Sequence, residues 1–260
     1  EYKYVVLDEQ TGCVLEWEQG PNRKSPQLTL ATSSVLVVCD HDLRLPECHW
    51  RVAGVVIPVF SLRSEGSQGV GDFGDLSLLA NFAATAGMHA IQLLPIYDTT
   101  QTHTWSDCYP YSAISIYALH PMYADLRQLP RLHSRDVMSR FETRAAQLNA
   151  LPQVDYEGVN QLKHDYLQML YAQEGPTVMA SDDYRKYYAE NEDWLLPYTA
   201  FCLLRDQYGT SDFRQWPECS VYQPGEIRLI AEHRSKETGY YAFVQYILDK
   251  QLKQAAAHAH

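Results

Sequence analysis

The clearest hydrophobic pattern in the chain is a pair of short apolar runs, at residues 54–62 (GVVIPVFSL) and 90–95 (AIQLLP). Both runs are rich in Val, Ile and Leu and are bounded by turn-forming residues, as buried parallel strands usually are. The sequence between them changes to a helical period, with Asp72 or Asp75 able to cap the start and Gly87 where a helix would stop. The apolar residues that set this period are Leu76, Leu79, Ala80, Phe82 and Ala83.

A strand, a helix and a second strand in this order predict a right-handed crossover unit of a parallel sheet. The loops at residues 61–71 and 96–121 then both leave the carboxyl ends of strands. In open and closed parallel sheets, this is the edge at which ligands bind. We therefore expect a functional site on these two loops.

The pattern differs on either side of this unit. Residues 1–39 predict short β-strands, residues 40–50 are polar and predict a linker, and residues 123–260 are mostly helical in pattern. We therefore predict two domains, at 1–48 (with its linker) and at 49–260. The expected strands are 2–7, 13–17, 27–30 and 34–39, and the expected main helices are 136–148, 159–173, 193–208 and 240–258.

Composition narrows the function classes. The 260 residues are 46% hydrophobic, enough for a sizeable core, and the net charge of -11 argues against a nucleic-acid partner, which needs clustered Lys and Arg. No run of about 18 apolar residues is present, so we expect no membrane span. The six cysteines form no C-x-x-C pair, which favours free thiols in a reducing, cytoplasmic compartment.

Three glycines in the first loop, Gly69, Gly71 and Gly74, spell the G-x-G-x-x-G pattern of dinucleotide-binding loops. Two features count against nucleotide binding. Gly69 lies well beyond the end of the strand, and Asp72 puts a carboxylate where a pyrophosphate would bind. A turn that needs glycine backbone conformations, followed by a capped helix, explains the same sequence pattern.

The second loop contains His103, Asp107 and Cys108, with His120 after them. These residue types could hold a metal or form a Cys/His nucleophile. Their spacing matches no ligand set, however, and no further residue orients a base. We therefore predict no metal site.

The stretch around these loops resembles a specific family. VIPVFSLRSEGSQGVGDFGD at residues 56–75 and SDCYPYSAISIYALHP at 106–121 are similar to the start of the catalytic domain of the 4-alpha-glucanotransferases, glycoside hydrolase family 77, especially its plant-type members. ENEDWLLPYTAF at 190–201 resembles the family's helical subdomain, and FVQYILDKQL at 243–252 the helix before its next barrel strand. The resemblance implies an α/β fold, the first part of a (β/α)8 barrel with a helical subdomain.

The β segment carries a second resemblance, since YKYVVLD and VLEWEQGPNR are similar to the C-terminal half of an antiparallel β starch-binding module of carbohydrate-binding module family 20. It implies that Trp17 stacks on a sugar, while Lys3 and Asn22 bond glucose hydroxyls. The family resemblance likewise implies that Tyr111 stacks under the sugar ring beside the bond to be broken. His120 stands where many relatives have Asn.

The family's reaction would be a retaining double displacement, in which a carboxylate attacks the sugar and a second sugar captures the covalent intermediate. Its carboxylates lie on later barrel strands, so we expect an internal piece of a longer protein, with no catalytic residue and no cofactor, that is inactive alone. The expected partner is an α-glucan: maltose, maltodextrin, starch or glycogen. A non-catalytic glucan-binding fragment and a nucleotide-binding protein are the alternatives. Uncovered barrel strands also predict self-association.

Overall fold

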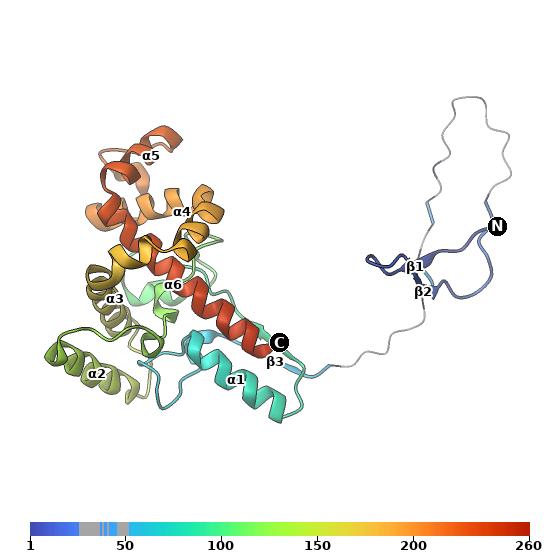
Figure 1. The fold of residues 1–260 in the computed structure, drawn as a ribbon, viewed down its shortest axis with the longest axis horizontal. Helices are drawn as coiled ribbons and strands as arrows, with labels where there is room; N and C mark the ends of the chain where they lie inside the picture. The colour runs from blue at the N-terminus through green and yellow to red at the C-terminus, as the bar shows by residue number, and fades with distance from the viewer. Residues whose placement is uncertain (26–36, 38, 41, 46–51) are drawn as a thin grey trace. The chain divides into compact units, whose positions relative to one another are not determined.

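The computed structural model describes residues 1–25, 37, 39, 40, 42–45 and 52–260 (Figure 1). The chain divides into two compact units, Glu1–Arg51 and Val52–His260. In the first unit, β1 (Val5–Leu7) and β2 (Val14–Trp17) pair antiparallel, with Val5 opposite Trp17. The two predicted strands 2–7 and 13–17 are thus present in shorter form.

Two other predicted strands fall on residues that the structure does not describe. All of 27–30 and most of 34–39 lie outside the described residues. Their prediction therefore stays open.

The second unit begins with the predicted parallel pair. The strands β3 (Gly54–Ile57) and β4 (Ala90–Leu93) lie parallel in one two-stranded sheet, with Gly54 opposite Ala90, and α1 (Phe73–Thr85) connects them. The strand–helix–strand prediction is confirmed. The first strand is shorter than predicted because Pro58 has no N–H for a ladder, and the chain turns into a 3-10 helix, η1 (Val59–Ser61).

The rest of the second unit is helical. Four long helices cover the four predicted ones, and a further helix between the last two was not predicted. The helices are α2 (Arg135–Asn149), α3 (Tyr156–Met179), α4 (Asp182–Tyr208), α5 (Pro224–His233) and α6 (Ser235–Ala259). The chain's last helix, α6, packs against α1, α3, α4 and α5 and so links the helices to the sheet region (Figure 1).

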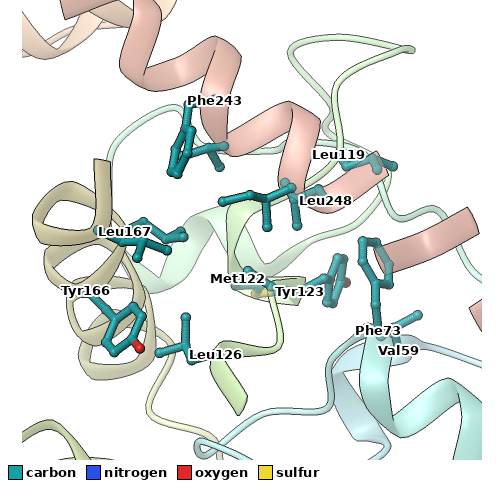
Figure 2. Close-up of a cluster of buried hydrophobic side chains, with 14 of the residues drawn as sticks. Val59, Phe73, Leu119, Met122, Tyr123, Leu126, Tyr166, Leu167, Phe243 and Leu248 are labelled. Carbon is teal, nitrogen blue, oxygen red and sulfur yellow. The ribbon is translucent and has the colours of Figure 1, made fainter. Parts of the chain in front are cut away.

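The main core lies between α6, α3, α1 and the segment 119–126. Figure 2 shows apolar side chains from these elements pointing toward one another. The rings of Phe73 from α1 and Tyr123 from the 3-10 turn η3 (Pro121–Tyr123) lie 5.6 Å apart, centroid to centroid. Burying such large apolar side chains stabilises the fold by about 1.5–3 kcal/mol each.

Two buried glutamines of α6 hold the backbone of the segment 119–125. The Gln245 side chain accepts from Leu119 N–H at 2.8 Å and donates to Leu119 C=O at 2.8 Å. The Gln251 side chain does the same with Asp125, again at 2.8 Å in both directions. Each amide thus satisfies a backbone donor and acceptor that would otherwise be buried without partners.

Candidate functional site

The loop from β4 to η3 presents the tyrosine that the resemblance marks. Tyr111 is 60% exposed, and its ring centroid lies 5.5 Å from that of the equally exposed Tyr109. Two open, flat rings side by side provide the kind of apolar surface on which a sugar ring can stack.

Backbone hydrogen bonds hold the two ends of this loop together. Asp98 N–H donates to Ala118 C=O, and Ile114 N–H donates to Asp98 C=O, both at 2.8 Å. His120 N–H donates to Ile96 C=O at 3.0 Å. The exposed Tyr111 is therefore carried on a rigid base.

Asp107 organises the turn at the start of the same loop. Its buried carboxylate accepts the backbone N–H groups of Gln101, Thr102 and His103 at 2.7–3.1 Å. A carboxylate with this many donors is held as a brace of the loop. Asp107 is thus occupied structurally and is not aimed at a substrate.

Asp98 links the loop to the helical part. Its buried carboxylate accepts from the Tyr198 hydroxyl of α4 at 2.7 Å and from Thr100 N–H at 2.9 Å. Gln245 of α6 donates to the same Tyr198 hydroxyl at 3.2 Å. Both helices therefore position the loop that carries Tyr111.

A second link runs from the loop to Asp206 at the end of α4. The His103 ring lies 2.8 Å from one oxygen of Asp206, and the Tyr241 hydroxyl donates to the other at 2.7 Å. Burial alone would raise the pKa of the Asp206 carboxyl, but bonds from His103, Arg205 and Tyr241 hold it below its usual range. The ionised carboxylate keeps the loop against α4.

The residues that could have formed a metal site or a Cys/His nucleophile do not come together, because each histidine contacts a different partner. His103 faces Asp206, whereas the buried His120 ring accepts Met122 N–H at 3.1 Å through Nδ1. Burial lowers the pKa of His120, although the carboxylates of Asp98 and Asp107 oppose the effect. Within the described residues, no cluster of three ligands that could hold a metal ion occurs.

The start of α1 explains the glycine pattern. The Asp72 side chain accepts from Gly74 N–H and Asp75 N–H, and Asp75 accepts from Asp72 N–H in return, which completes a capping box. The predicted cap is confirmed. The protein's own carboxylate fills the position that a pyrophosphate would need.

In the first unit, Trp17 of β2 is 58% exposed. A pair of backbone bonds joins Tyr2 to Arg23, at 3.0 and 2.8 Å, so Lys3 and Asn22 lie on neighbouring segments. The Asn22 amide donates to Glu1 at 3.3 Å. The sugar contacts of Trp17, Lys3 and Asn22 stay a prediction.

Comparison with known proteins identifies the family. Residues 57–260 match the sequence model of glycoside hydrolase family 77, 4-alpha-glucanotransferase. The chain belongs to this family. The 4-alpha-glucanotransferase DPE2 of Oryza sativa subsp. japonica is 37% identical over 263 residues, covering all of this chain and 27% of the rice protein. The 4-alpha-glucanotransferase of Chlamydia trachomatis serovar D is 29% identical over 79% of this chain and 38% of its own length.

Solved structures of family members share the fold. Amylomaltase from Streptococcus agalactiae, in complex with acarbose, matches 81% of this chain and 41% of its own with a TM-score of 0.64 and 18% identity. Amylomaltase from Corynebacterium glutamicum matches 80% of this chain and 28% of its own with a TM-score of 0.56. The chain thus spans between 27% and 41% of the length of these 4-alpha-glucanotransferase relatives.

The two residues of α4 that hold the loop carrying Tyr111 were not found from the sequence. Tyr198 and Asp206 lie 100 and 103 residues after their partners. The Trp194–Tyr198 spacing in the 4-alpha-glucanotransferase-like helical segment was the available signal, because it places two large rings on one helix face.

Proposed function

We propose that the chain is part of a 4-alpha-glucanotransferase that transfers α-1,4-glucan segments between maltodextrins, starch or glycogen by retaining double displacement. The observation that carries the proposal is the exposed Tyr111 on a braced loop, within the span 57–260 that matches the family. In this proposal, Tyr111 stacks on the glucan, and the helices α4 and α6 keep it in place.

The proposed architecture follows from the same match. The unit β3–α1–β4 would form the beginning of a (β/α)8 barrel, and the longer helices its helical subdomain, within the predicted domain 49–260. The β1–β2 pair, with its exposed Trp17, would form the end of a starch-binding module within 1–48. Two glucan-contacting regions would then act on one polymer.

We propose further that no carboxylate of this chain carries the chemistry. Retaining glycoside chemistry needs two carboxyl groups about 5–5.5 Å apart that flank the sugar. The buried carboxylates of Asp98 and Asp107 and the partly exposed carboxylate of Asp206 instead bind backbone and side-chain donors of the protein. The chain alone should therefore show no glucan transfer from maltose to glycogen, and robust transfer in that assay would refute this part of the proposal.

The glucan contacts are tested by affinity electrophoresis in gels that contain amylopectin. Trp17→Ala and Tyr111→Ala should each reduce the retardation, because each removes an exposed ring from a proposed sugar surface. Leu15→Ala and Leu151→Ala, which also remove exposed apolar side chains, serve as matched controls and should migrate as the wild type does. Unchanged retardation in both test variants would contradict the assigned contacts.

The same assays distinguish the proposed 4-alpha-glucanotransferase from a glucan-binding protein without catalysis. Retardation by amylopectin without transfer, when the chain is also tested together with the remainder of its protein, would favour that alternative. For the weaker nucleotide alternative, the expected result is that neither NAD nor ATP raises the melting temperature.

A cytoplasmic location remains part of the proposal. It is supported by the cysteines that the structure describes, Cys13, Cys39, Cys108, Cys202 and Cys219, which are all free thiols. No helix within the described residues is long and apolar enough to cross a bilayer.

A further inference from the structure

In the second unit, α5 packs against α4 (Figure 1). An aromatic pocket is lined by residues of α4, by Ile227 of α5, and by the segments 114–117 and 213–222. It has a volume of about 410 Å³ and is open to solvent. A volume of this size lies in the range of small-molecule sites. Seven aromatic residues contribute to its walls: Tyr117, Trp194, Tyr198, Phe201, Phe213, Trp216 and Tyr222.

The rings of this pocket are held in fixed positions. Tyr117 and Trp194 are stacked, with ring centroids 5.8 Å apart and an angle of 21° between their planes. Trp194 donates its ring N–H to Asn191 at 2.9 Å. Deeper in the wall, Trp216 donates to Thr210 C=O at 2.8 Å and packs against Phe201. The pocket is thus built before a ligand arrives, which lowers the entropic cost of binding.

The polar groups of the pocket define the chemistry of its ligand. None of the residues that line it carries a charge. Tyr117 and Tyr222 are 59% and 60% exposed, and in the described part of the chain their hydroxyls make no hydrogen bond. A ligand that fits would be neutral, with flat apolar faces for the rings and hydroxyls for the tyrosines. Sugar residues of a glucan have all three properties.

We propose that this pocket is an additional α-glucan-binding site, separate from the ring pair Tyr109–Tyr111. The proposal rests on the proposed function, because the choice of a glucan over another neutral ligand comes from the family. Tyr117 belongs to the same loop as Tyr111, six positions later. A glucan chain bound at Tyr111 and a second segment in the pocket would therefore be held by one braced loop.

The test uses the chain with Trp17→Ala and Tyr111→Ala already in place, so that the other proposed contacts are absent. Maltoheptaose binding to this double variant is measured by isothermal titration calorimetry. Adding Tyr117→Ala or Tyr222→Ala should weaken the remaining binding on the order of fivefold, as expected for the loss of one stacking partner. Phe82→Ala on α1, which removes an equally exposed ring, is the matched control and should change nothing.

The outcomes distinguish the two proposals. If the double variant does not bind maltoheptaose, or if the Tyr117→Ala and Tyr222→Ala variants bind like the Phe82→Ala control, the pocket is not a glucan site. If Trp17→Ala and Tyr111→Ala bind maltoheptaose with wild-type affinity while Tyr117→Ala binds it more weakly, the glucan contacts proposed for Trp17 and Tyr111 are wrong. The proposal of a glucan site in the pocket is then supported. Equal melting temperatures of all variants show that the changes in affinity do not come from unfolding.

Discussion

The His120 ring shows how a buried polar residue serves the site without touching a ligand. Its Nδ1 accepts Met122 N–H at the start of η3, and its backbone N–H closes the base of the loop that carries Tyr111. Because Nδ1 is an acceptor, the neutral ring carries its proton on Nε2. The side chain therefore has to stay neutral for the loop to be held.

This requirement predicts a pH dependence of stability. The unfolded chain takes up a proton on His120 below its ordinary pKa of about 6.5, whereas burial lowers the pKa in the folded state. Between these two pKa values only the unfolded state is protonated, so stability is lost as the pH falls below about 6.5. Lys163 and Arg205 act with burial, and Asp98 and Asp107 act against it.

Replacing His120 by Asn, the residue that the family resemblance leads us to expect there, should remove this dependence while keeping an acceptor for Met122. Between about pH 7.5 and pH 5.5, the wild type should lose on the order of 1 kcal/mol of unfolding free energy relative to His120→Asn. Urea titrations at both pH values measure this difference. His133→Asn, at a histidine with an 81% exposed side chain, is the control. Parallel stability curves for wild type and His120→Asn would contradict the prediction.

At this scale, the sequence reveals residues whose partners are near in the chain. The Asp72 capping box joins residues three apart and is readable as a pattern. The bond between Asp98 and Tyr198 joins residues 100 apart, and only the packing of α4 against the loop brings them together. The resemblance marked Tyr111, but it could not show which distant side chains hold its loop.

At the scale of elements, the glycines of the first loop act through close packing. A Cβ on Gly71 would lie 2.1 Å from Val59 C=O and 2.7 Å from Leu62 N, both backbone atoms of the segment that follows β3. Backbone atoms cannot move aside as a flexible side chain can. The glycine thus allows the start of α1 to lie against η1.

Gly71→Ala should therefore destabilise the second unit by about 1–3 kcal/mol or more. The matched control is Gly225→Ala in the first turn of α5, where a Cβ would meet nothing within 4 Å. That substitution should stabilise by about 0.4–1 kcal/mol through the unfolded state. Thermal unfolding monitored by circular dichroism measures both, and a Gly71→Ala variant as stable as the wild type would show that the contact relaxes at no cost.

Helix positions were predictable, but several helix boundaries were not. The pair Gly175–Pro176 is typical of a helix stop, yet α3 continues to Met179 with Pro176 inside it. The start of α5, Pro224–Gly225, looks like a turn in sequence, which is why this helix was not predicted. At both places the local turn signal did not predict the observed boundary.

At the scale of the whole molecule, the sheet of the second unit is small. In the described part of the chain, no third strand pairs with β3 or β4. Val56 of β3 is 60% exposed, and an exposed strand with a free edge favours pairing with another chain. The self-association expected from the sequence is therefore placed at this sheet as a proposal.

Sedimentation velocity of the chain should show a mass that rises with concentration. Val56→Lys should reduce this rise, because a charge on the exposed strand opposes edge pairing. Leu229→Lys on α5, at a residue 52% exposed, is the control and should associate as the wild type does. A monomer at every concentration would contradict the proposed self-association.

The two glutamines of α6 have a consequence for how the family can vary. Gln245 and Gln251 are six positions apart, as are Leu119 and Asp125, whose backbones they bond. Inserting or deleting one residue between 119 and 125 would detach one of the two anchors, so evolution should keep this interval constant in length. The stretch between Asp98 and Ala118 is held at its ends and also inside, by the bonds of Asp107 and by the contact of His103 with Asp206. Insertions and deletions in relatives should therefore avoid the interval 119–125.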